Sequence, residues 1–134
     1  MENFFFDIET VGQYKDFESF ELDDIRGSEL FKKKFHKMNW ETKYQSYSEA
    51  YLEQAGIIST YGKIVCISFG YINNDGVSMI SSYYGDDEKD IVNKFNILLK
   101  KIETKNFNLC GFRILYFDLP YLLHKLHKYG IEPA

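Results

Sequence analysis

The stretch Phe4-Phe5-Phe6-Asp7-Ile8-Glu9-Thr10, close to the amino terminus, decides the fold prediction. A continuous apolar run that ends in charged residues is typical of a β-strand buried on both faces. We therefore predict such a strand over residues 3–8. Because side chains alternate along a strand, Asp7 and Glu9 would lie on the same face at the end of this strand.

A pair of carboxylates in this position needs a physical explanation. Two unit charges about 4 Å apart repel by about 1 kcal/mol in water and by several times that at a lower effective dielectric. Asp7 and Glu9 are therefore expected either to share a proton or to bind a cation, and a divalent metal suits ligands that are all hard oxygens. From these residues alone, a strand end that simply faces solvent explains the pattern equally well.

Length and composition indicate one intracellular globular domain. The chain has 134 residues, of which 18% are aromatic, and a formal net charge of −4, which argues against a broad basic face for nucleic acid. Cys66 and Cys110 lie in apolar, strand-like stretches, which is typical of reduced core residues in a cytoplasmic protein. The apolar run after the amino terminus is too short for a signal peptide, and no stretch is long enough to span a membrane.

The remaining pattern predicts the element order strand, insertion, hairpin, helix, strand, helix. Residues 13–60 are rich in charge and aromatics, and we interpret them as an insertion within a single domain rather than as a second domain. Lys32 to Lys34 are expected to form a solvated helix face, with phosphate contact as the alternative. Hydrophobic periodicity, turn residues and capping residues predict helices over 28–38, 46–54, 87–102 and 118–129, a hairpin of strands 63–73 and 77–84, and a strand over 107–112.

Three stretches together resemble the DEDD, or DnaQ-like, superfamily of 3′-5′ exonucleases, and most closely the proofreading exonuclease domain of B-family DNA polymerases. The first is Phe6-Asp7-Ile8-Glu9-Thr10, which is similar to the first motif of the family. The second is Lys63-Ile64-Val65-Cys66-Ile67-Ser68, which is similar to its second strand. The third runs from Cys110-Gly111 to Phe117-Asp118-Leu119-Pro120-Tyr121-Leu122 and is similar to its second motif.

The resemblance implies an α/β, ribonuclease H-like fold with a mixed sheet and flanking helices, here without the last strand and helix. It also implies a site for two Mg²⁺ or Mn²⁺ ions, in which Asp7 bridges both ions, Glu9 binds the ion that carries the nucleophilic water, and Asp118 holds the other. The backbone at Thr10 would approach the 3′-terminal nucleotide. The implied substrate is a nucleic acid 3′ end, with single-stranded DNA favoured over RNA.

Two departures from the family pattern qualify this expectation. Arg113 stands where the second motif normally has Asn, and it would either clamp a phosphate or pair with Asp118. No Asp follows Asp118, so the third motif, with its fourth carboxylate, is missing from these residues. Tyr83 and Asp87 share the spacing of that motif but precede the second motif. We therefore expect little or no nuclease activity from this chain, and a noncatalytic ribonuclease H-like binding module or degenerate remnant is the alternative.

The same departure has a structural consequence. Without a further strand, the strand over 107–112 would form an exposed edge, which is a template for pairing with another chain. We therefore expect self-association through this edge.

Overall fold

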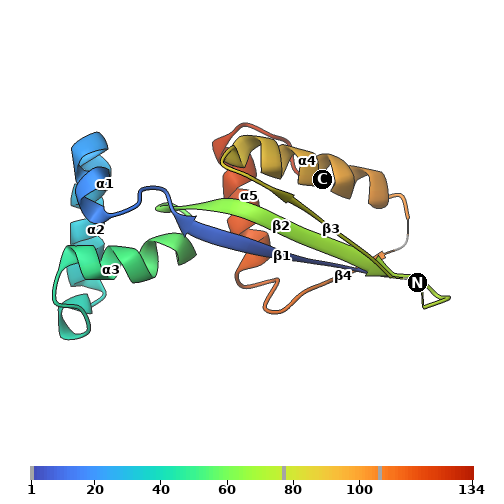
Figure 1. Ribbon diagram of the computed structural model, residues 1–134, viewed down its shortest axis with the longest axis horizontal. Helices are drawn as coiled ribbons and strands as arrows, with labels where there is room; N and C mark the ends of the chain where they lie inside the picture. The colour runs from blue at the N-terminus through green and yellow to red at the C-terminus, as the bar shows by residue number, and fades with distance from the viewer. Residues whose placement is uncertain (1, 77, 106) are drawn as a thin grey trace. The chain divides into compact units, whose positions relative to one another are not determined.

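The computed structural model describes residues 2–76, 78–105 and 107–134 (Figure 1). These residues form two compact units. The first contains the chain up to Glu9 together with Ile64–Ala134, and the second contains Thr10–Lys63. The second unit therefore lies within the sequence of the first and extends three residues beyond each end of the predicted insertion.

The first unit is built on a 4-stranded mixed sheet with the strand order β3-β2-β1-β4. Its strands are β1 (Glu2–Gly12), β2 (Gly62–Ile72), β3 (Ser78–Tyr84) and β4 (Phe107–Cys110). β1 and β4 run parallel, β2 and β3 pair in the antiparallel direction, and the arrows in Figure 1 show that β1 and β2 also run in opposite directions. The chain is thus α/β, with a sheet compatible with the expected ribonuclease H-like fold.

Two strand ends differ from the predicted ones by more than one residue. β1 continues four residues past Ile8 to Gly12, and β4 stops at Cys110 instead of Phe112. The hairpin is confirmed by the pairing of β2 with β3, although Val77, predicted to begin its second strand, lies outside the described residues. As predicted, β4 is an edge strand of the described sheet.

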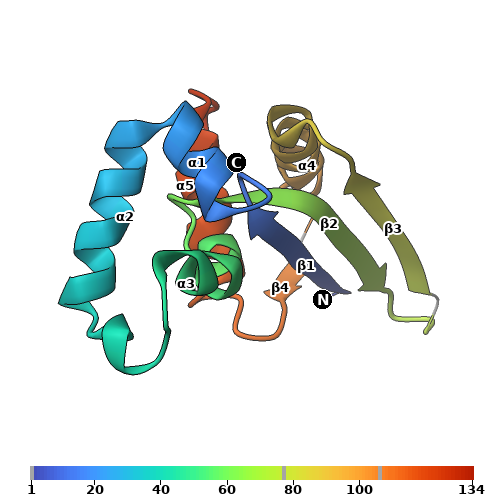
Figure 2. The ribbon, with the colours of Figure 1, turned by 60° about the vertical axis from the view of Figure 1, so that its left-hand side comes forward.

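Two helices, α4 (Glu88–Ile102) and α5 (Asp118–Lys128), cover one face of this sheet (Figures 1 and 2). The buried residues of β1 alternate as Phe4, Phe6 and Ile8, and they share one core with side chains of both helices. Because alternate residues point to the same side, both helices lie on that side. The prediction that β1 is buried on both faces is therefore wrong. The other members of this core are Ile64, Ile67, Ile91, Val92, Phe95, Tyr121, Leu122 and Leu126.

The second unit is helical and contains α1 (Phe17–Asp23), α2 (Ile25–Lys37) and α3 (Tyr47–Gln54), with the short 3₁₀ turns η1 (Trp40–Thr42) and η2 (Ala55–Ile57). The prediction for α3 is confirmed, including its capping residue Ser46. The start predicted for α2 is wrong, because Asp24 caps this helix and Ser28 lies buried inside its first turns. α1 was not predicted.

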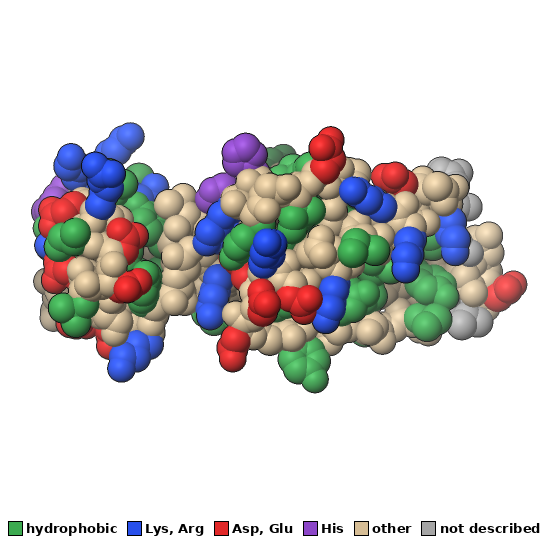
Figure 3. Space-filling model, turned by 90° about the horizontal axis from the view of Figure 1, so that it is seen from above, with side chains coloured by type: hydrophobic (Ala, Val, Ile, Leu, Met, Phe, Trp, Pro, Cys, Tyr) green, Lys and Arg blue, Asp and Glu red, His purple; other side chains and the backbone are tan. Residues whose placement is uncertain are grey.

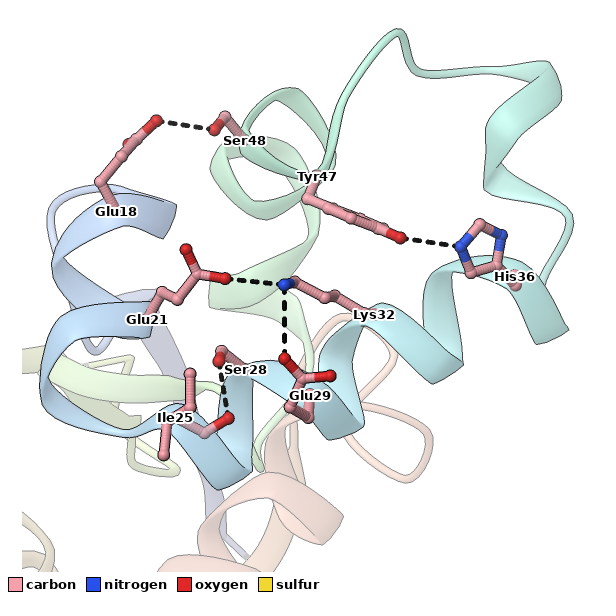
Figure 4. Close-up of polar contacts among 9 residues, drawn as sticks. All are labelled: Glu18, Glu21, Ile25, Ser28, Glu29, Lys32, His36, Tyr47 and Ser48. Carbon is pink, nitrogen blue, oxygen red and sulfur yellow. Dashed lines mark hydrogen bonds and ion pairs between the residues drawn. The ribbon is translucent and has the colours of Figure 1, made fainter.

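An aromatic core holds the second unit together. Phe31, which is fully buried, lies at its centre against rings from α1, η1 and α3. Around this core, polar contacts join the helices at the surface (Figure 4): Lys32 of α2 lies 2.7 Å from Glu21 of α1, and the Tyr47 hydroxyl of α3 lies 2.8 Å from His36 Nε2 of α2. Within α2, Lys32 also lies 3.4 Å from Glu29. Large aromatic side chains dominate the buried area and provide most of the stabilisation of so small a unit.

Candidate functional site

The candidate site lies on the sheet of the first unit, and β1 positions its first two carboxylates. Ile8 is buried in the core, whereas Asp7 and Glu9 on either side of it are exposed. Strand alternation therefore anchors the backbone through Ile8 and leaves both acidic side chains on the opposite face. This part of the geometry was predicted from the sequence.

The third carboxylate, Asp118, reaches the same part of β1 from the start of α5. Its Oδ2 accepts a hydrogen bond of 2.9 Å from the backbone N–H of Ile8, across a sequence separation of 110 residues. β4 pairs with β1 only as far as Phe5, opposite Cys110, so the backbone of Ile8 lies beyond the end of that pairing. The Asp118 side chain thus takes the place that a longer β4 would fill.

Gly111 makes this arrangement possible where β4 ends. A Cβ atom at this position would lie 2.8 Å from the carbonyl oxygen of Phe6 and 3.2 Å from the side chain of Ile114. The chain leaving β4 therefore passes too close to β1 for any side chain larger than hydrogen. The sequence signal Cys110-Gly111 marks this close approach.

The electrostatics of Asp7, Glu9 and Asp118 show that the three groups influence one another. The pKa of the Glu9 carboxyl is raised, first by a hydrogen bond with Asp7, then by burial and by the charges of Asp7 and Asp118. Burial raises the pKa of Asp118, as does the charge of Asp7, while the hydrogen bond from Ile8 opposes the shift. Raised pKa values are the expected response of carboxylates that lie close together and are partly shielded from water.

The donor chemistry fits a divalent cation, because the carboxylates offer only hard oxygens. Asp7 and Glu9 are close enough to share a hydrogen bond, and they are the pair best placed to hold such an ion. The full ligand set is not assembled, however, since the described residues contain no group of three or more His, Cys, Asp or Glu arranged to bind a metal. One oxygen of Asp118 is bonded to the Ile8 N–H, so that oxygen is not free to bind an ion in this arrangement.

Arg113 is exposed and has a φ of 53°, in the left-handed region. Its carbonyl oxygen accepts hydrogen bonds from the N–H groups of Tyr116 and Phe117, which closes the turn that leads to Asp118. No ion pair joins Arg113 to Asp118 among the described residues, so the structure gives no support to the pairing considered above. Asn adopts this backbone conformation more readily than Arg does, which gives a physical reason for Asn at the equivalent place of the resembling motif.

The other residues considered from the sequence have no recorded contact with these three carboxylates among the described residues. Thr10 is half-buried and belongs to the second unit. Tyr83 lies in β3 and Asp87 caps α4, as the predicted strand end and helix start required. His124 and His127 are exposed on α5. Both cysteines, predicted to be reduced core residues, are free but only half-buried.

Sequence reasoning missed a buried polar cluster in the same unit. Glu88, at the start of α4, accepts hydrogen bonds of 2.6 Å from the Ile64 N–H and 2.6 Å from the Tyr129 hydroxyl, and its Oε1 lies 3.6 Å from Lys125 Nζ. Glu88 and Lys125 are both buried. The signal in the sequence was the position of Lys125, which the helical repeat places on the same side of α5 as Leu122 and Leu126, the side that faces the core.

Comparison of the chain with protein-family models, with curated proteins and with solved structures finds no match. The resemblance to exonucleases therefore rests on the three quoted stretches and on a sheet compatible with the expected fold. Among the described residues, no helix is both long and apolar enough to cross a membrane.

Proposed function

We propose that the first unit is a ribonuclease H-like, metal-dependent 3′-5′ exonuclease domain that acts on the 3′ end of single-stranded DNA. The observation that supports this proposal is the hydrogen bond from Ile8 to Asp118, which brings a residue from the far end of the sequence to the strand segment that carries Asp7 and Glu9. The motif resemblance implies this proximity, and the geometry agrees with it.

In this proposal, each of the three carboxylates has its own role in metal binding. Asp7 and Glu9, exposed on one face of β1, would hold Mg²⁺ or Mn²⁺, and Asp118 would complete the site after exchanging its bond to Ile8 for a metal contact. Bound metal would supply an activated water and charge stabilisation at the phosphodiester. Because the fourth carboxylate of the resembling family has no equivalent in residues 1–134, a polypeptide of these residues alone is expected to cleave DNA weakly or not at all.

The experiment that tests the site is therefore metal binding rather than turnover. Mn²⁺ would be titrated into the protein and the free ion followed by electron paramagnetic resonance. The Asp7→Asn variant should lose at least tenfold in affinity, whereas Asp86→Asn, which removes an exposed carboxylate elsewhere in the same unit, should bind as the wild type does. Equal affinity in the wild type and Asp7→Asn would overturn the proposal.

A second function, a noncatalytic binding module of the same fold, is favoured by one observation: no three-ligand group is assembled among the described residues. This alternative predicts that DNA binds equally well with Mg²⁺ or with a chelator, and that a 3′-labelled oligonucleotide stays intact in Mn²⁺. Robust digestion of that oligonucleotide would exclude it, and would also contradict the weak activity expected of residues 1–134.

A further inference from the structure

The helix α2 in the second unit concentrates positive charge in a protein that is acidic as a whole. Its thirteen residues include Arg26 and four lysines but a single acidic residue, Glu29. The formal charge of the chain is −4, so this helix has the opposite sign to the average surface. In Figure 3, several blue basic side chains lie together at the upper edge of this unit, and others lie at its lower edge.

Three of these residues form one face of the helix, which we call the α2 basic face: Arg26, Lys33 and Lys37. They are separated by seven and four residues, which is about two turns and one turn, so they lie within a narrow arc. All three are exposed, and Leu30 lies between them on the same side. At about 1.5 Å per residue, the charges are spaced by about 10 Å and about 6 Å along the helix axis.

Lys32, in contrast, is neutralised within the unit. Its Nζ lies 2.7 Å from Glu21 and 3.4 Å from Glu29 (Figure 4). It also lies over the rings of Phe17 and Tyr47. Among the ion pairs formed by the described residues, none involves a member of the α2 basic face. Lys32 therefore has a structural role, whereas the α2 basic face presents its charge to solvent.

The apolar side of α2 restricts which partners this face can bind. A basic amphipathic helix often binds a membrane or a hydrophobic groove through its apolar side. Here that side carries Phe31 and Phe35, which are 0% and 5% exposed in the aromatic core. Binding must then depend on the charged face, and a partner with regularly spaced negative charge fits it best.

We propose that the α2 basic face binds the phosphate backbone of single-stranded nucleic acid. The choice of nucleic acid among anionic partners rests on the proposed function. Arginine and lysine on one helix face make sequence-independent phosphate contacts, which position a strand without reading its bases. The face would thus hold the body of a strand, a role separate from any chemistry at the carboxylates.

The test measures DNA binding in EDTA, where no metal-dependent cleavage occurs. A fluorescent single-stranded DNA would be titrated with wild-type protein and with Arg26→Gln/Lys33→Gln/Lys37→Gln by fluorescence anisotropy at several salt concentrations. Each phosphate neutralised contributes about −0.7 to the slope of log K against log salt. Three contacts predict a difference of about 2 in this slope, so between about 50 and 200 mM salt the wild type should lose about 20-fold more affinity than the variant.

The matched control removes the same charge from the first unit, as Lys89→Gln/Lys100→Gln/Lys101→Gln, three exposed positions of α4. This control should keep the wild-type slope. If both variants lose the same affinity, or if the wild type does not bind, the inference is overturned. Equally tight binding of poly-glutamate by the wild type would also overturn the choice of nucleic acid.

A further variant separates this inference from the proposed function. Asp7→Asn should keep full DNA binding in EDTA while losing Mn²⁺ affinity. Loss of DNA binding in the triple variant, together with unchanged Mn²⁺ affinity, supports the α2 basic face. Normal DNA binding by the triple variant refutes it, whatever the outcome at the metal site.

Discussion

The buried cluster around Glu88 allows a quantitative prediction for the Glu88→Gln substitution. The change keeps the size of the side chain but removes the negative charge that faces Lys125 at 3.6 Å. Lys125 is 0% exposed, and burial already lowers its pKa. Breaking a buried ion pair on one side typically destabilises a protein by about 3–5 kcal/mol, because it leaves a charge in a poorly solvated place.

An upper limit for this loss follows from the proton equilibrium of Lys125. The folded variant can relieve the buried charge by losing a proton, which for a lysine with an ordinary pKa of about 10.4 costs about 4.6 kcal/mol at pH 7. At pH 9 the same step costs about 1.9 kcal/mol. In the variant, the unfolded state binds more protons than the folded state between these pH values, so stability rises with pH. The destabilisation should therefore fall from about 3 to 4.6 kcal/mol at pH 7 to no more than about 1.9 kcal/mol at pH 9.

Urea unfolding at pH 7 and pH 9 measures this difference directly, provided that the slope of free energy against urea is unchanged between variants. A second substitution, Lys125→Met, serves as the control. In the Glu88→Gln background it removes the buried charge and should restore most of the lost free energy of unfolding at pH 7. A loss below about 1 kcal/mol at pH 7, or a loss that does not shrink at pH 9, would show that the ion pair is not the cause.

Three further predictions concern the site and the sheet edge. The pKa of Glu9 is raised in the folded protein, so above about pH 4.5 the folded state binds more protons than the unfolded state, and stability falls as the pH rises. Asp7→Asn should flatten this fall and stabilise the protein by about 1 kcal/mol at pH 7, as measured by urea unfolding. Arg113 has a positive φ, which Asn adopts more readily than Arg does, so Arg113→Asn should raise the free energy of unfolding by about 0.5–1 kcal/mol in thermal melts. Arg113→Ala should not, because Ala adopts a positive φ no more readily than Arg does. Leu109→Lys on the edge strand β4 should reduce self-association in sedimentation experiments, whereas Leu22→Lys on α1 should leave self-association unchanged. A wild type that stays monomeric at high concentration would refute self-association through β4.

The elements with a strong periodic pattern could be predicted from the sequence. α4 was predicted with its cap at Asp87, because Ile91 and Phe95 repeat at the helical period and an Asp precedes them. The hairpin followed from the turn residues between two alternating strands. In both cases the local sequence contains the whole signal, since the burial that stabilises the element is visible in the spacing of its own residues.

In the second unit, the sequence pattern did not predict α1 or the start of α2. α1 spans only seven residues, and its buried Phe17 and Phe20 give less than two turns of periodicity. The true start of α2 was missed because Asp24 ends α1 and caps α2, while Ser28, a plausible cap by composition, donates its hydroxyl to the Ile25 carbonyl inside the helix. A choice between two good capping residues is decided by packing against other helices, which the sequence does not display.

The candidate site was partly predictable for a similar reason. The positions of Asp7 and Glu9 follow from alternation along one strand, but the position of Asp118 depends on where β4 stops and on how closely Gly111 passes β1. The hydrogen bond to Ile8 satisfies a buried backbone donor, a role that Asp118 would have without any ligand. Proximity of Asp118 therefore has a structural explanation as well as a functional one.

Asp7 and Glu9 are both exposed on β1, so the structural explanation for their arrangement is a part of the strand that faces solvent. Among the ion pairs and hydrogen bonds between described residues, neither carboxylate has a basic partner, and their mutual contact raises the pKa of Glu9. Like charges held on one strand face cost stability, so a purely structural role would be better served by a neutral residue at either position. Stabilisation of the wild type by Mn²⁺ that is absent in Asp7→Asn would show that a cation offsets this cost, whereas equal stability of both proteins with and without Mn²⁺ would leave the solvent-facing explanation standing.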